Sequence, residues 1–222
     1  MRIAALVSGG KDSCFAAMCC LKAGHDIVAL ANLHPKQGAN DDLDSFMYQT
    51  VGHEAIEAFA QAFLDGDVPL YRCTIEGNAV CQGKEYTPEK GDEVEDLLPL
   101  LQKIKTEKQI DAICCGAVLS SYQKVRVESI CRRLGIKSLA PMWEQDQVDL
   151  VQRMISCHLN AILVKVAACG LSPEKHLGKS LEEMLPTLMA LNDKFGLHVC
   201  GEGGEFESFV LDCPAFGKRI VV

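Results

Sequence analysis

Residues 3–13 read IAALVSGGKDS, and this stretch decides the fold of the 222-residue chain. The apolar residues Ile3–Val7 predict a buried strand, and a helix with one buried face follows the pair Gly9–Gly10. Glycine permits a tight turn, so the first N–H groups of the helix point at a common centre. Lys11 adds a full positive charge there, which suits pyrophosphate. The predicted phosphate contacts are Ser8, Gly9, Gly10, Lys11, Asp12 and Ser13.

The rest of the N-terminal half alternates short apolar runs with helix-period segments. Strands are predicted at Ile3–Val7, Ile27–Leu33, Pro69–Ile75 and Ile110–Cys115. This alternation predicts an α/β fold with a doubly wound parallel sheet. Asp92 followed by Glu95 predicts a helix N-cap with its reciprocal carboxylate, and residues 76–91 read as a long loop that could cover a site.

The pattern changes after Ser138, which predicts two domains, residues 1–138 and a smaller α+β unit at residues 139–222. The second unit has a helical stretch at about residues 145–155, an apolar run at Ala161–Ala168 and a glycine-rich acidic segment near the end. Lys165 interrupts the apolar run, and a buried ammonium there would require a partner. The last residues, Ile220–Val222, form a strand-like run, from which we expect a shortened chain.

Composition excludes several classes of protein. Thirty acidic against 22 basic residues give a formal charge of −8, which disfavours a nucleic-acid partner. No apolar run is long enough to span a membrane, and no secretory signal is evident, so we expect a cytoplasmic protein. The 12 cysteines include no C-x-x-C pair, so we expect reduced thiols in the core and no metal site built from protein ligands.

The loop SGGKDS resembles the PP-loop of ATP pyrophosphatases; no Walker A motif occurs. Four further segments resemble the diphthine–ammonia ligase (diphthamide synthetase) family. They are LDSFMYQTVGH at residues 43–53, GDEVEDL at 91–97, GAVLSSYQKVRVE at 116–128 and GEGGEFE at 201–207. Together with the loop they run collinearly from residue 8 to residue 207. The resemblance implies a PP-loop ATPase fold of the HUP type.

The resemblance also implies a reaction. A carboxylate of diphthine on translation elongation factor 2 is adenylated by ATP with Mg2+, and ammonium then gives diphthamide, AMP and pyrophosphate. Because no glutaminase-like domain is seen, free ammonium is the expected nitrogen donor. Whether the protein is a homodimer is left open, as are two rival functions: another PP-loop amide ligase or tRNA-modifying enzyme, or a nucleotide-binding module without chemistry.

Candidate site residues lie in the loop and the resembling segments. Ala31 and Asn32 end a predicted strand at the edge where doubly wound sheets bind nucleotides. The other expected nucleotide contacts are Gly116, Ser120, Gln123 and Arg126. Expected substrate contacts are Ser45, Tyr48, Gln49, His53 and Glu54 on a predicted helical stretch, with Glu93, Glu95, Glu202, Glu205 and Glu207.

Catalytic roles are expected for Lys11, Asp12, Glu202 and Glu205. The acidic residues could bind the trimethylammonium group of diphthine or guide ammonium. Simpler interpretations remain open for four residues. Asp12 could be a first-turn acid of its helix, His53 could be structural, Arg126 could lie on a solvated helix face, and Glu95 could serve only in capping.

Overall fold

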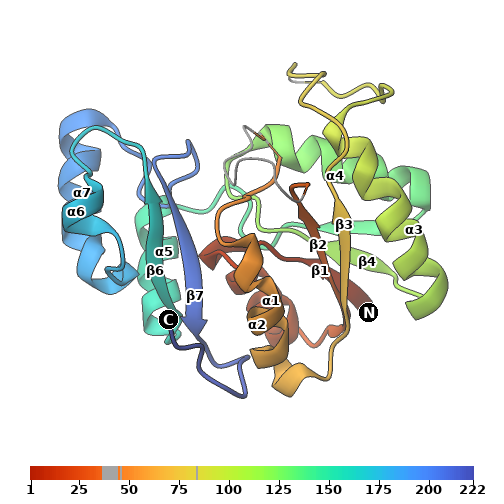
Figure 1. Cartoon of the computed structure of the whole chain (residues 1–222), viewed down its shortest axis with the longest axis horizontal. Coiled ribbons are helices and arrows are strands. Elements are labelled where there is room, and N and C mark those ends of the chain that lie inside the picture. Colours follow the sequence, from red (N-terminus) through yellow and green to blue (C-terminus); the bar gives the residue numbers. More distant parts are fainter. Residues whose placement is uncertain (37–44, 46, 84) are drawn as a thin grey trace.

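The computed structural model describes all residues except 37–44, 46 and 84. Its centre is a five-stranded parallel sheet in the order β3-β2-β1-β4-β5 (Figure 1). The strands are β1 (Arg2–Leu6), β2 (Asp26–His34), β3 (Leu70–Thr74), β4 (Ala112–Cys114) and β5 (Lys137–Leu139). Strands β2 and β3 lie on one side of β1, and β4 and β5 lie on the other side. The sequence prediction of a doubly wound parallel sheet is therefore confirmed.

Helices cover both faces of this sheet because successive strand residues point to opposite sides. Ile3 and Ala5 of β1 belong to one core cluster, together with α1 (Lys11–Lys22) and α2 (Ile56–Ala62). Ala4 belongs to the other cluster, with α3 (Leu97–Lys108) and α4 (Ser121–Leu134). A sheet buried on both faces explains why its strands read as continuous apolar runs. Short 3-10 helices lie at η1 (His53–Ala55), η2 (Leu64–Gly66) and η3 (Glu93–Asp96).

A second, two-stranded antiparallel sheet packs beside the first. Its strands are β6 (Asn160–Val166) and β7 (Phe206–Asp212), and its helices are α5 (Gln147–Ser156), α6 (Pro173–His176) and α7 (Leu181–Phe195). Buried residues of α7 and β7 belong to the same core cluster as Phe15 of α1. Within that cluster, Cys14 Sγ lies 3.6 Å from Cys213 Sγ, and all 12 cysteines are free. The two halves therefore share one apolar core.

Two local predictions need correction. The described residues 47–52 form no α-helix: the N–H groups of Met47 and Tyr48 donate to the Ser45 hydroxyl, and helical structure begins only at the short η1. Phe46, which the predicted helical stretch includes, lies outside the described residues. A serine side chain that binds nearby backbone competes with helix formation, and Gly52 has φ of 81°. Asp92 does cap η3, but Glu95 pairs with Arg133 instead of returning to the cap.

No helix among the described residues is long and apolar enough to cross a membrane.

Candidate functional site

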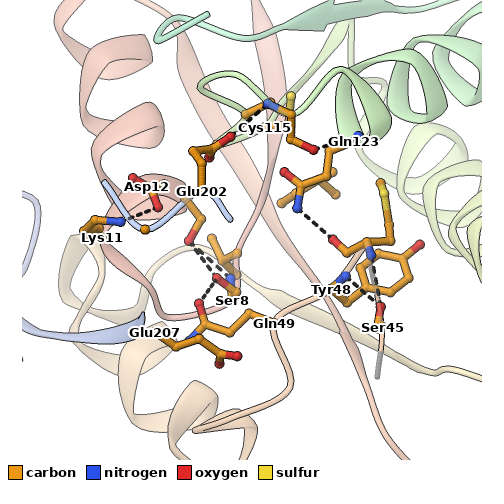
Figure 2. Close-up of a pocket in the computed structure, with 18 of the residues that line it drawn as sticks. Ser8, Lys11, Asp12, Ser45, Tyr48, Gln49, Cys115, Gln123, Glu202 and Glu207 are labelled. Atoms are coloured by element: carbon orange, nitrogen blue, oxygen red, sulfur yellow. Dashed lines mark hydrogen bonds and ion pairs between the residues drawn. The ribbon is translucent and has the colours of Figure 1, made fainter. Parts of the chain in front are cut away.

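A cavity of about 520 Å³ opens at the carboxyl edge of the parallel sheet, where β2, β1 and β4 end. This is the point at which the strand order reverses, the usual ligand position in doubly wound sheets. The segment after α7 also lines the cavity, and Figure 2 shows its Glu202 among the lining residues. The predicted site residues that line it are Ser8, Lys11, Asp12, Ser13, Ala31, Asn32, Ser45, Tyr48, Gln49, Gly116, Ser120, Gln123, Glu202 and Glu207.

The glycine turn between β1 and α1 is held by contacts with the second sheet. The Gly9 carbonyl accepts a hydrogen bond from Val210 N–H at 2.9 Å, and Lys11 N–H donates to Ser208 Oγ at 3.2 Å. Gly9 has φ of 82°, and a Cβ on Gly10 would lie 2.5 Å from Gln49 Oε1. Position 9 thus needs glycine, and a side chain at position 10 would require Gln49 to move. Gly10 is the N-cap of α1 and supplies no side-chain cap, so the first-turn N–H groups after that of Lys11, which donates to Ser208 Oγ, are left for an anion.

Lys11 is 2% exposed, and its ammonium donates to Asp12 Oδ2 at 2.7 Å and to the Cys200 carbonyl. Burial opposes its charge, but attraction to Asp12 and further acidic neighbours outweighs burial, so the pKa of Lys11 is raised. Burial also raises the pKa of Asp12, and Lys11 offsets part of that rise. Asp12 Oδ1 is buried without a hydrogen-bond partner among the described residues. The loop therefore presents a neutralised pair with one carboxylate oxygen left to accept from a ligand.

The three carboxylates of the glycine-rich segment have different roles. Glu202 accepts hydrogen bonds from Leu119 N–H at 2.9 Å and Ser120 N–H at 2.8 Å, which ties the segment to the start of α4. Glu207 Oε1 lies 3.7 Å from Lys165 Nζ, so Glu207 is the partner that Lys165 was expected to need. Glu205 does not line the cavity: it accepts from His198 N–H at 2.9 Å and Gly203 N–H at 2.8 Å. Glu205 therefore shapes the segment.

The other end of the cavity is more apolar. Leu33, Met47 and Val127 line it, together with the rings of Tyr48 and Tyr122. Gln123 Nε2 donates to the Met47 carbonyl at 3.2 Å, which joins α4 to the segment before η1. Asn32 Nδ2 donates to the Val7 carbonyl at 2.9 Å, so its amide holds β1 against β2 at the cavity floor.

Several predicted contacts lie outside the cavity. Arg126 is fully buried and donates to carbonyls of residues 81 and 83, away from the cavity. Glu93 is also buried and accepts from Ser45 Oγ at 2.7 Å, whereas Glu95 binds Tyr86 and Arg133. His53 stacks on His34 with ring centroids 6.4 Å apart, and Glu54 is exposed. These residues support the cavity wall or lie away from it.

Tyr122, Phe206 and Ser208 are among the lining residues that sequence reasoning missed. Phe206 and Ser208 follow the period of two in β7, so they share one face of the strand. That alternation is the signal that could have found them. The described residues contain no group of three or more His, Cys, Asp or Glu side chains placed to hold a metal ion.

A glycine turn that leads into a helix N-terminus at the switch point of a doubly wound sheet is typical of a nucleotide-phosphate-binding α/β protein. The chain belongs to the diphthamide synthase family: the family's N-terminal domain model matches residues 1–138 and its C-terminal domain model matches residues 146–222. It is thus a ligase of an ATP-using family.

The curated relatives of the chain carry the name diphthine–ammonia ligase. The protein of Bos taurus is 56% identical over 100% of this chain and 83% of its own length. That of Danio rerio is 56% identical, with 100% and 86% covered. The protein of Schizosaccharomyces pombe is 52% identical over 100% of this chain, which spans 36% of that longer relative.

Proposed function

We propose that this chain amidates diphthine on translation elongation factor 2, using ATP and ammonium and releasing AMP and pyrophosphate. The observation that carries the proposal is the glycine turn at the N-terminus of α1, with Lys11 in the first turn, lining a cavity of about 520 Å³. The full-length identity to named diphthine–ammonia ligases supports the choice of substrate.

The chemistry requires activation of a poor electrophile. A carboxylate resists attack by ammonia, and adenylation gives it a good leaving group, so that ammonia displaces AMP. The first-turn N–H groups of α1 and the hydroxyls of Ser8 and Ser13 would bind the phosphates. Lys11 would offset their charge, because its raised pKa keeps the ammonium charged at neutral pH.

The phosphate end of the cavity holds more acid than base. Glu207 is paired with Lys165, but Lys11 stands against both Asp12 and Glu202, so unaccompanied ATP would meet net repulsion. Mg2+ fits this charge pattern, and Asp12 Oδ1, which has no hydrogen-bond partner among the described residues, is a suitable oxygen to hold it. Mg2+ would neutralise the phosphates and polarise the phosphorus that the carboxylate attacks.

The acidic wall also fits a cationic substrate. Glu202, Glu207 and the ring of Phe206 all line the cavity, and carboxylates together with an aromatic ring are suited to trimethylammonium. We assign these carboxylates to substrate binding, and Glu205 to shaping the segment that carries them. Residues 1–138 would then bind the nucleotide, and residues 139–222 would supply most of the substrate wall.

One assay tests the whole proposal. The protein is incubated with ATP, Mg2+, ammonium and elongation factor stalled at diphthine, and AMP and the mass of the modified histidine peptide are followed. Amide formation with an equal amount of AMP is the expected result. AMP without amide would mean that the acceptor is a different one, and ATP binding without AMP would favour a nucleotide-binding module.

A further inference from the structure

Strand β7 of the second sheet contacts the phosphate loop at three successive residues. Ser208 Oγ accepts a hydrogen bond from Lys11 N–H at 3.2 Å. Val210 N–H donates to the Gly9 carbonyl at 2.9 Å. Between these two, the Phe209 ring packs against Gly9, where an added Cβ would lie 2.5 Å from the ring. The second sheet therefore forms part of the wall around the N-terminus of α1.

Ser208 is held firmly on this wall. It is 4% exposed and lines the cavity. Its backbone carbonyl accepts from Gln49 Nε2 at 3.1 Å, and its hydroxyl oxygen accepts from Lys11 N–H. A residue that is fixed at both its backbone and its side chain loses little further freedom when it binds a ligand. Ser208 is thus pre-organised for a partner in the cavity.

The hydroxyl group of Ser208 has a hydrogen that the described part of the chain does not use. A serine hydroxyl has one hydrogen to donate as well as two lone pairs that accept. Ser208 Oγ accepts from Lys11 N–H, and no acceptor for its own hydrogen lies among the described residues. Because a buried donor without an acceptor is costly, this hydrogen indicates an acceptor that enters the cavity.

The two serines of the phosphate loop differ from Ser208 in this respect. Ser8 Oγ donates to Gln49 Oε1 at 3.3 Å (Figure 2). Ser13 Oγ donates to the Gly10 carbonyl at 3.0 Å. Each of them must leave an internal acceptor before it donates to a phosphate. Ser208 can donate to a phosphate while it keeps its hydrogen bond to α1.

The surroundings of the Ser208 hydroxyl favour an anion as its acceptor. It lies at the first turn of α1, where the helix dipole and the Lys11 ammonium attract negative charge. The N–H group of Lys11 polarises the hydroxyl to which it donates, and a polarised O–H is a stronger donor. A hydrogen bond from such a donor to a charged phosphate oxygen is stronger than one to a neutral acceptor.

We propose that Ser208 binds a phosphate oxygen of ATP through its hydroxyl group. The second sheet then supplies a nucleotide ligand in addition to the substrate wall, and the phosphate site is complete only when both sheets are packed together. This inference rests on the proposed function only for the identity of the nucleotide.

The test measures the Kd for ATP in the presence of Mg2+. Ser208→Ala removes the donor, and we expect the Kd to rise about tenfold. Ser208→Thr keeps a hydroxyl group, and its Kd should stay within about threefold of wild type. Ser129→Ala is the matched control, because Ser129 is a buried serine of α4 that does not line the cavity. This control should bind ATP like wild type.

The melting temperature of the protein without ATP separates phosphate binding from helix capping. If Ser208 served only as a cap, Ser208→Ala would lower this temperature and release Lys11 N–H to the phosphate. ATP affinity would then stay the same or rise, and that result would overturn the proposal. The proposed role instead predicts weaker ATP binding and a smaller rise of the melting temperature when ATP with Mg2+ is added.

A second pair of variants covers a disturbance of β7 by alanine. Ser208→Val and Ser208→Thr have nearly the same shape and differ in a methyl group against a hydroxyl group. We expect ATP binding about tenfold weaker in the valine variant than in the threonine variant. Equal affinities in these two would show that the hydroxyl does not bind the nucleotide.

The outcomes for this inference and for the proposed function can be told apart. If the wild type binds ATP but forms no amide, the proposed function is wrong, and the Kd values of the Ser208 variants still decide the role of the hydroxyl. If the wild type forms the amide and the variants bind ATP as tightly, only the Ser208 assignment is wrong. A wild type that binds no ATP would reject both.

Discussion

At the scale of single residues, the environment of each charged group determines its role. Lys11, Glu202 and Glu205 all belong to motifs of the resembling family, yet their contacts differ. Lys11 is buried against Asp12, Glu202 bridges to α4, and Glu205 binds only backbone N–H groups of its own segment. A sequence motif shows which residues are present, but their hydrogen bonds and burial in the folded protein determine which of them can face a ligand.

Replacing Lys11 by Ala should weaken ATP binding about tenfold or more, because the phosphates lose their buried cation and Asp12 loses its partner. Titration calorimetry with ATP and Mg2+ measures the change. Lys22→Ala, at the exposed last turn of the same helix, is the control and should bind like wild type. Equal ATP affinity in the Lys11 variant would reject the assignment of the phosphate loop.

Replacing Glu205 by Gln should reduce kcat with the protein substrate while leaving ATP affinity within about twofold. Glutamine offers one acceptor oxygen where the structure uses two, so either the His198 or the Gly203 N–H group loses its partner and the segment is held less firmly. Steady-state turnover and ATP titration separate the two effects. A loss of ATP affinity equal to the loss of kcat would show that Glu205 acts on the nucleotide.

At the scale of elements, the ion pair between Glu95 and Arg133 joins η3 to α4. The two terminal nitrogens of the Arg133 guanidinium donate to the two oxygens of the Glu95 carboxylate, at 2.7 and 2.8 Å. This bidentate hydrogen bonding lowers the pKa of Glu95 below its ordinary 4.5. Because the pKa of Glu95 is lower in the folded protein than in the unfolded chain, its ionised carboxylate stabilises the fold at pH values above the ordinary pKa. This stabilisation is lost as the pH falls through the lowered pKa of the folded state.

Glu95→Gln should therefore lower the free energy of unfolding at pH 7 by about 1 kcal/mol or less, since both side chains are partly exposed. The difference from wild type should shrink as the pH falls below about 4.5. Urea unfolding at pH 7 and at lower pH measures both values, with Glu174→Gln as an exposed control. A deficit that stays constant with pH would mean that packing, not charge, is lost.

At the scale of the whole molecule, the second sheet completes the site on the first. Val210 binds the Gly9 carbonyl, Ser208 binds Lys11 N–H, and α7 and β7 share a core with α1. Neither half alone has the full cavity wall. A division into two domains at about residue 139 remains a prediction, and the shared core argues for strong coupling between the parts.

We therefore expect one cooperative unfolding transition. The single tryptophan, Trp143, lies between the two sheets in sequence, so its fluorescence and the far-UV circular dichroism should change at the same temperature. ATP with Mg2+ should raise that temperature for the whole transition, because a ligand stabilises the state it binds. Two separate transitions, with only one shifted by ATP, would show that the halves unfold independently.

The sequence by itself determined the parallel sheet, its strands and the phosphate loop, because these depend on short-range patterns: apolar runs, a glycine pair and a helix that follows. It also placed most cavity-lining residues, since the carboxyl ends of neighbouring parallel strands meet at one edge. Arg126 was expected at the nucleotide and instead donates to the Cys81 and Gly83 carbonyls, while the described residues 47–52 form no helix.

Only the tertiary structure decided which carboxylate faces the cavity, where Arg126 binds, and that Ser208 reaches Lys11 across 197 residues of sequence. The physical reason is that hydrogen-bond partners distant in sequence leave no local periodic signal. A glutamate that binds two N–H groups and one that faces a cavity look alike in sequence. Their difference arises only when the two sheets pack together.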